Sequence, residues 1–437
     1  MTISHKAGEG DAASVKWTPQ GVFTVAFLGM TAGVQMSDMG LQAISLSAIQ
    51  KTFDVSDATL GALQGLAGVL VGSALAVPLA RFADQFSRRW VLLCLILAST
   101  AMMVLSALAP NFPLFFIGRS AAGITEFAMV PLVYSMIPDL APERHRVMAN
   151  LSFAALMAVG ASSGFYFAGP LLSTAPDLIP MDIEPWRSAF LLLACAGLPL
   201  LLLATLTADP PRRMGAADFQ AGGSLKLFLR RRRKAIGYFA GTAGCLALAV
   251  QAFNQLVSLA LERRFEAPPG QIGHAMGIIV LTITVGCLPV AWLLDRMLTR
   301  RLGQAARPLV MGGCALIAIF VAVLLTTIDT LDRAFIVVGV TLFMMSTANA
   351  LVPTMLQDII PATFRARSFA IWSFVVSVFG AAGPLLAGTL SGAVFDGHLV
   401  NAIALTAIPA LMISAFCAMQ SFLLTGKEQT MAAGQHA

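Results

Sequence analysis

The chain has 437 residues, of which 57% are hydrophobic and only 11% are charged, and its formal net charge is +6. A soluble domain carries roughly 25% charged residues and could not bury this much apolar surface. The composition therefore excludes a soluble globular protein and indicates that lipid surrounds most of the chain.

Twelve stretches are long and apolar enough to span a membrane as helices of about 20 residues. The sequence thus predicts an all-α integral membrane protein with 12 transmembrane helices. In chain order the predicted spans are 21–47, 57–80, 90–109, 113–137, 148–173, 188–207, 236–261, 270–294, 308–328, 334–357, 368–394 and 400–424.

The longest predicted connection, 208–235, divides the helices six and six. It ends in the basic run Arg230 to Arg233 with Lys234, which we expect to contact anionic lipid headgroups rather than nucleic acid. The predicted segments are a cytoplasmic N-terminal tail (1–20), a first six-helix bundle (21–207), a cytoplasmic linker (208–235), a second six-helix bundle (236–424) and a cytoplasmic C-terminal tail (425–437). Most of the 28 Lys and Arg residues fall in the tails and alternate loops, so both termini should be cytoplasmic.

The two halves repeat each other at an offset of 219 residues. Five residues recur in this register, and the matched pairs are Asp139 and Asp358, Pro142 and Pro361, Arg146 and Arg365, Gly164 and Gly383, and Gly169 and Gly388. A second echo, FADQFSRR after helix 2 and LLDRMLTRR after helix 8, places an acid ahead of a basic pair in each half. Such repeats predict two similar bundles that can rock about a central site.

Ionisable side chains within the spans are few and costly to insert. Helix 1 carries Asp38 with Gln35 and Gln42 on roughly the same face, and helix 4 carries Arg119 and Glu126 two turns apart. We hypothesise a pair between Asp38 and Arg119 that a proton can break. A carboxylate beside Arg stays ionised, whereas one enclosed in an apolar cavity without that partner takes up a proton. The alternative is a static structural ion network.

The spans of the second half offer uncharged polar residues instead, and positions 338 and 345, the counterparts of Arg119 and Glu126, are Val and Met. Any proton machinery is therefore predicted in the first half alone. The candidate substrate-cavity residues are Gln35, Gln42, Tyr134, Gln251, Asn254, Gln255, Ser346 and Asn349. Helix-to-helix hydrogen bonding is the alternative role for the amides, and packing is the alternative for Tyr134.

Neither His145 nor His274 has a Cys, Asp or Glu beside it at metal-ligand spacing. The six cysteines are isolated in apolar stretches. There is also no phosphate loop or nucleophile motif. We therefore expect no metal, no cofactor and no enzymatic activity.

The loop after helix 2 resembles the signature G-x-L-A-D-R-x-G-R-K of the major facilitator superfamily. In the stretch Ala80 to Arg89 the charges are kept at Asp84, Arg88 and Arg89, while Ala80, Gln85 and Ser87 depart from the pattern. The resemblance implies two pseudo-symmetric six-helix bundles and a cytoplasmic gate. The gate residues would be Asp84, Arg88, Arg89, Asp295, Arg300 and Arg301.

Residues 35 to 170 resemble the Spinster branch of lysolipid and sphingolipid transporters within that superfamily. The similar segments are SAIQKTFDVSDATLGALQ, the spacing of Arg119, Gly123 and Glu126, and GASSGFYFAG. The resemblance implies proton coupling through Asp38, Arg119 and Glu126. Where the branch has Asp-Arg on helix 1, this chain has Asp38-Met39.

We therefore expect a monomeric, proton-coupled secondary transporter of the bacterial inner membrane. It would move an amphipathic organic molecule or lysolipid by alternating access, with protons and membrane lipids as its other partners and no nucleic acid. One alternative is an importer of small organic anions, in which Arg119 contacts the substrate. Another is a non-transporting membrane sensor or lipid scaffold.

Overall fold

The computed structural model describes residues 18–71, 86–142, 145–207, 225–360 and 365–434, and no strand occurs among them. The first half contains α1 (Pro19–Phe53), α2 (Asp57–Ala62), the π-helix η1 (Leu63–Val71), α4 (Arg88–Ala107), α5 (Phe112–Leu140), α6 (Arg146–Tyr166), α7 (Ala168–Leu178), α8 (Pro185–Cys195) and α9 (Gly197–Ala204). The second half contains α10 (Leu225–Arg231), α11 (Arg233–Phe265), α12 (Pro269–Leu302), the 3₁₀ helix η3 (Gly303–Ala305), α13 (Ala306–Thr327), α14 (Leu331–Ile359), α15 (Arg365–Val394) and α16 (Leu399–Gly434).

Nine stretches of the described residues are long and apolar enough to cross a membrane. One of them, Pro269–Thr327, contains both α12 and α13, because η3 joins these helices without a long loop. Predicted helix 5 is built from α6 and α7, which divide at Phe167, and predicted helix 6 is built from α8 and α9, which divide at Ala196. The chain is an all-α membrane protein, as the composition predicts.

Local sequence signals explain several helix ends. The side chains of Ser56, Ser87 and Asn111 each accept a hydrogen bond from the main-chain N–H three residues later, at the starts of α2, α4 and α5. The helices α1 and α11 end at Asp54 and Glu266, which adopt left-handed conformations with φ of 48° and 49°. Corresponding helices of the two halves therefore end in the same way.

The repeated glycines mark equivalent helix crossings. A Cβ atom on Gly164 would lie 2.1 Å from the main-chain oxygen of Ser37, and one on Gly383 would lie 2.2 Å from that of Leu248. This first pair of glycines lets α6 cross α1 and α15 cross α11 within their own halves. The second pair serves contacts between the halves: Gly169 meets Gly270 of α12, and Gly388 meets the main chain at Asp57. Only a residue without a Cβ permits these approaches.

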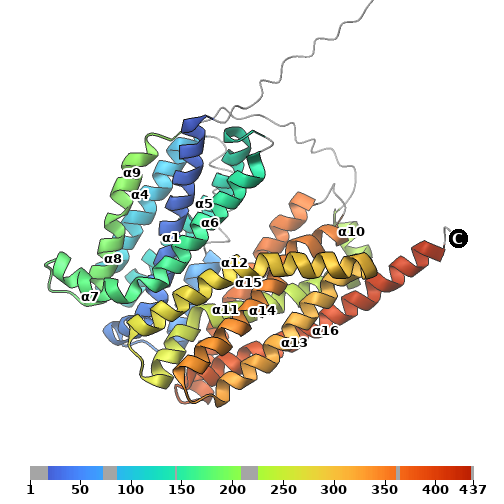
Figure 1. Cartoon of the computed structure of the whole chain (residues 1–437). Coiled ribbons are helices and arrows are strands. Elements are labelled where there is room, and N and C mark those ends of the chain that lie inside the picture. The colour runs from blue at the N-terminus through green and yellow to red at the C-terminus, as the bar shows by residue number, and fades with distance from the viewer. Residues whose placement is uncertain (1–17, 72–85, 143–144, 208–224, 361–364, 435–437) are drawn as a thin grey trace, which may run out of the picture.

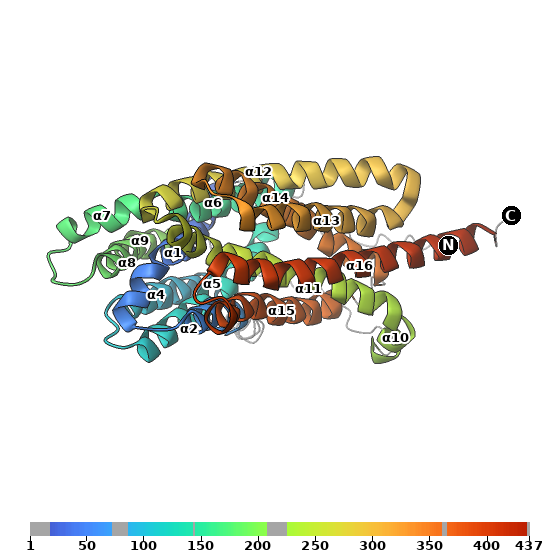
Figure 2. The same ribbon diagram turned by 90° about the horizontal axis from the view of Figure 1, so that it is seen from below.

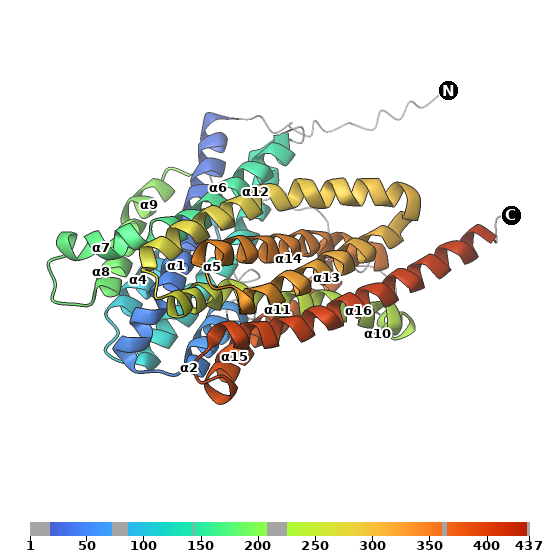
Figure 3. The same cartoon turned by 60° about the horizontal axis from the view of Figure 1, so that its bottom comes forward.

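The two halves converge at one end and diverge at the other (Figure 1). Viewed from below, α12 runs beside α6 and α7, and α15 lies beside α2 (Figure 2). The turned view shows the same two contact zones (Figure 3). The start of α1 and the end of α16 both lie on the side where the halves diverge. We call this side the open end and the opposite side the closed end.

Candidate functional site

The predicted pair of buried charges forms between α1 and α5. Arg119 donates from Nη1 to Oδ2 of Asp38 over 2.6 Å, and the two side chains are 5% and 1% exposed. The Arg119 guanidinium also lies 5.5 Å from the ring centroid of Phe190 on α8, within cation–π range. Two opposite charges are thus held in direct contact inside the first half.

Several buried polar atoms around this pair have no hydrogen-bond partner within the described part of the chain. They are Oδ1 of Asp38, Nε of Arg119 and both side-chain polar atoms of Gln35. A cavity of about 20 Å³ is lined by Arg119 and Gln42, and a second of the same size is lined by Gln35 and Ser99. Each is large enough for one water molecule. Arg119 therefore borders a space in which one water molecule fits.

The side chain of Glu126 lies outside the described residues. The helix α5 carries this residue seven positions after Arg119, which is two turns, or about 10 Å, along the axis. Its place on the same side of α5 as Arg119 follows from that spacing.

A chain of amides links the first half to the second beside Arg119. Gln42 donates to Oε1 of Gln64 over 2.8 Å, and Gln64 donates to the main-chain oxygen of Gln255 over 3.3 Å. All three line the cavity that contains Arg119. Of the predicted cavity residues, Gln42 and Gln255 are brought together here, whereas Gln35 lies in the separate cavity within the first half.

The remaining predicted cavity residues are more open. Gln251, Asn254 and Ser346 are half-buried on α11 and α14, and Asn349 is exposed. Tyr134 is also exposed, with its ring edge-on to Phe153 at a centroid distance of 5.2 Å. Asn349 and Tyr134 lie in the parts of α14 and α5 nearer the open end.

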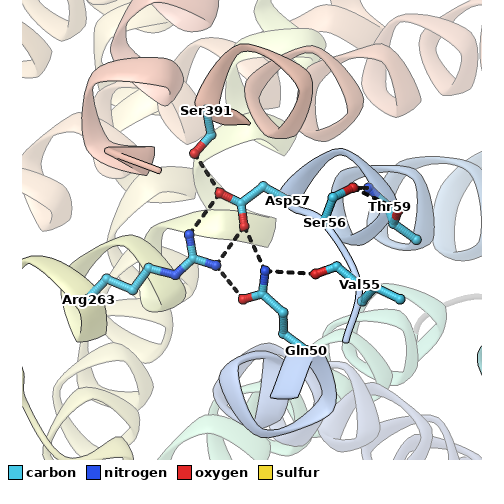
Figure 4. Close-up of polar contacts among 7 residues, drawn as sticks. All are labelled: Gln50, Val55, Ser56, Asp57, Thr59, Arg263 and Ser391. Carbon is cyan, nitrogen blue, oxygen red and sulfur yellow. Dashed lines mark hydrogen bonds and ion pairs between the residues drawn. The ribbon is translucent and has the colours of Figure 1, made fainter. Parts of the chain in front are cut away.

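The closed end is held by a network that joins four helices (Figure 4). Arg263 of α11 donates to both carboxylate oxygens of Asp57 at the start of α2, over 2.8 and 2.7 Å. Gln50 of α1 accepts from Arg263 over 2.5 Å and donates to Asp57 over 2.9 Å. Ser391 of α15 donates to Asp57 over 2.6 Å. A bidentate Arg–carboxylate pair with further donors is among the stronger polar contacts of proteins.

Close helix packing reinforces this closure. A Cβ on Gly61 would lie 2.3 Å from the main-chain oxygen of Pro384, and one on Gly65 would lie 2.2 Å from that of Ala381. On the other flank, Ser162 donates to the main-chain oxygen of Gly277 over 2.8 Å. The halves are therefore in contact on both flanks of the closed end.

Sequence reasoning missed Asp57 and Arg263 as a contact between the halves. Asp57 directly follows the capping residue Ser56, where an acidic residue is ordinary because it favours the helix N-terminus. Arg263 lies in a charged cluster at the end of predicted helix 7, where basic residues commonly mark the membrane interface. The two residues are 206 positions apart in the chain, so no local pattern connects them.

Two groups of charged residues in the described chain near the open end pair within their own halves. Arg88 pairs with Asp139, and Arg307 pairs with Asp358 and, over 3.0 Å, with Asp295. These pairs obey the 219-residue register, since Arg88 corresponds to Arg307 and Asp139 to Asp358.

The predicted gate residues divide into three groups. Asp84 lies outside the described residues. Arg88 and Asp295 form the pairs just described, and Arg89 donates to the main-chain oxygen of Thr205. Arg300 and Arg301 are exposed in the last turn of α12. The charged partner of Asp295 is thus Arg307. The similarity of FADQFSRR to LLDRMLTRR did not indicate this pair, because it matches Arg88 and Arg89 with Arg300 and Arg301, which are exposed.

The comparisons with known proteins agree with this architecture. The family model described as Major Facilitator Superfamily matches residues 28–384. The chain belongs to the Major Facilitator Superfamily. It is therefore a multi-pass membrane protein and a secondary transporter, and it is not an enzyme.

Two relatives and one solved structure illustrate the similarity. An MFS-type efflux pump of Mycolicibacterium smegmatis is 24% identical over 406 residues, which cover 90% of each chain. A gentisate transporter of Corynebacterium glutamicum is 26% identical over 359 residues, which cover 79% of this chain and 75% of the relative. The structure of a bacterial homologue of the human lysosomal transporter Spinster, in an inward-facing and unoccupied conformation, matches with a TM-score of 0.78 and 18% identity. That match covers 93% of this chain and 97% of the other, and it concerns the fold.

Proposed function

We propose that this major facilitator is a proton-coupled transporter that moves an amphipathic organic molecule or lysolipid across the bacterial inner membrane by alternating access. The observation that carries the proposal is the buried ion pair between Asp38 and Arg119. Both termini of the transporter would be cytoplasmic, so the open end would face the cytoplasm and the closed end would face the periplasm.

The coupling follows from the cost of an unpaired buried charge. Protonation of Asp38 removes the negative partner of Arg119, and a buried cation without its partner is destabilising by about 3–5 kcal/mol. The guanidinium then gains from any rearrangement that brings it water or a polar group of the substrate. Loss of the proton restores the pair. Glu126, two turns along α5, is the second acid of the proposed relay.

The mixture of side chains on α11 and α14 supports the proposed substrate class. The amides of Gln251, Asn254 and Asn349 can hydrogen bond a polar headgroup, while most of the residues around them on α11 and α14 are apolar. Such a lining suits a molecule with both polar and apolar parts.

An importer of small organic anions is the second candidate. The gentisate transporter of Corynebacterium glutamicum is a relative over most of this chain, and Arg119 is a cation that lines a cavity beside the contact between the halves. In that case the anion would replace the Asp38 carboxylate at Arg119.

The test is uptake into proteoliposomes, with a panel of lysolipids and aromatic or aliphatic carboxylates, under an imposed pH gradient. Asp38→Asn keeps the shape of the side chain but removes its charge. The matched control is Asp54→Asn, because Asp54 is exposed at the end of the same helix in a left-handed conformation that Asn also adopts.

We expect Asp38→Asn to lose gradient-driven uptake by at least about tenfold, the factor that corresponds to 1.4 kcal/mol, while counterflow exchange persists. Asp54→Asn should behave as wild type. Uptake that responds equally to the gradient in all three proteins would contradict proton coupling through Asp38. A protein that transports no member of the panel under any gradient would favour the sensor or scaffold alternative.

A further inference from the structure

A deep apolar groove runs between α12 and α14 near the closed end. Its volume is about 450 Å³. Its walls include Ile278 and Ile283 from α12 and Ile336, Gly339 and Phe343 from α14, and Thr282 supplies its one polar side chain. Gly339 leaves free space at the bottom of the groove, because a Cβ atom there would lie 3.7 Å from its nearest neighbouring atom, in Ile279.

The groove faces away from the space between the halves. On α12, Gly277 contacts Tyr166 of the first half, whereas Ile279, two residues later, lines the groove. Two residues correspond to about 200° around the helix, so the groove and the contact with the first half lie on opposite faces of α12. The halves are also closed on each other at the level of the groove, through Arg263 with Asp57 and through Ser162 with Gly277. The exposed apolar surface at this level therefore meets the surrounding membrane.

The position along the helices places the groove within one leaflet. It extends from Ala275 to Ile283 on α12, which begins at Pro269, so it covers depths of about 9 to 21 Å from that end of the helix. A bilayer is about 40–45 Å thick with its headgroups, so one leaflet reaches about 20–22 Å from the headgroup level at which α12 begins. The groove thus lies beside the acyl chains of the leaflet at the closed end.

A cationic side chain lies on α14 between the groove and the start of the helix. Arg333 is exposed in the first turn of α14, three residues before Ile336 and seven before Val340, on one stripe of the helix. This location is the level of the lipid headgroups, where a phosphate would meet the guanidinium.

We propose that this groove is a binding site for one acyl chain of a phospholipid of the leaflet at the closed end, with the lipid phosphate at Arg333. The depth, the apolar lining and the cation at its outer rim match the tail and the phosphate of such a lipid. The bound acyl chain fills the gap between α12 and α14. The helix α12 packs against the first half through Gly273 and Gly277. The acyl chain therefore braces a helix of the closing contact. The proposal does not depend on proton coupling or on the transported substrate.

The test is photo-crosslinking in nanodiscs with a phosphatidylglycerol that carries a diazirine on one acyl chain, followed by peptide mapping. Gly339→Leu fills the groove, and the starting Cβ position has ordinary van der Waals space. Gly313→Leu is the matched control, since it adds the same side chain on α13 where nothing lies within 4 Å of the Cβ. Elution as a single symmetric peak in detergent checks the folding of both variants.

In the wild type we expect adducts concentrated on 275–283 and 335–344. These adducts should fall at least about tenfold in Gly339→Leu, because each methylene excluded from the groove weakens burial, and should be unchanged in Gly313→Leu. Arg333→Gln should lower the yield with the phosphate lipid but not with a diazirine diacylglycerol. Adducts spread evenly over the exposed faces of α12, α13 and α16, or equal yields in the two Leu variants, would overturn the proposal.

Discussion

Asp57 occupies the point where α1, α2, α11 and α15 meet, and it accepts hydrogen bonds from three of its neighbours. Asp57→Asn removes the charge opposite Arg263 and replaces one acceptor by a donor. We expect this change to weaken closure by about 1–3 kcal/mol, the cost of leaving a buried polar partner unsatisfied. The arrangement in which the two halves separate at the closed end should become correspondingly more populated.

The measurement is the distance between spin labels on Asp177 and Asp329, which are exposed in opposite halves near the closed end. Asp57→Asn should add a longer distance to the distribution, and Asp54→Asn should leave it as in the wild type. An unchanged distribution in Asp57→Asn would mean that the other contacts, the glycine packing and the hydrogen bond of Ser162 to Gly277, maintain the closure.

At the scale of the helices, the four repeated glycines separate two roles. Gly164→Ala and Gly383→Ala should lower thermal stability, because each added methyl group meets main chain within the same half. Gly169→Ala and Gly388→Ala should instead lengthen the label distance at the closed end, because their clashes fall between the halves. Thermal unfolding in detergent and the label distance distinguish the two pairs.

Gly392→Ala is the control for this set, since nothing lies within 4 Å of a Cβ at that position. It should change neither quantity. Equal losses of stability in all four repeated positions would contradict the division between packing within a half and packing between halves.

The helices themselves could be predicted from the sequence because long apolar stretches and capping residues are local signals. The sequence also indicated the contact of Asp38 with Arg119, since charged residues within a membrane need partners. The coupling role of this pair and of Glu126 stays a prediction.

Other features could not be predicted, for physical reasons. The contact of Arg263 with Asp57 depends on how two bundles meet, and each residue alone has an ordinary explanation at a helix end. The role of Arg307 was not predicted because this residue follows η3, whereas the sequence similar to Arg88 and Arg89 is Arg300 and Arg301, before η3. Gln35 is separated from the other amides because it lies two turns, about 10 Å, before Gln42 on α1, so Gln35 meets α4 and α9 whereas Gln42 meets η1.

The molecule consists of two halves that contact each other at the closed end, while Arg88 with Asp139 and Arg307 with Asp358 pair within single halves near the open end. The proposed cycle requires that these contacts exchange while each half stays intact. Asp38 and Arg119 lie inside the first half, and Arg119 lines a cavity with Gln255 of the second half, so a change in the charge of the pair can alter the balance between the two arrangements. The central claim is therefore that protonation of Asp38 moves this balance.

The most direct measurement is the Asp177 to Asp329 label distance as a function of pH, in the wild type and in Asp38→Asn. As the buffer is acidified, the wild-type distribution should shift between its two forms, because a proton on Asp38 would remove the negative charge opposite Arg119. Asp38→Asn should lose most of this response, because the Asn side chain takes up no proton and only Glu126 remains of the proposed relay. A wild-type distribution that ignores pH, or an Asp38→Asn variant that keeps the full wild-type response, would contradict the account.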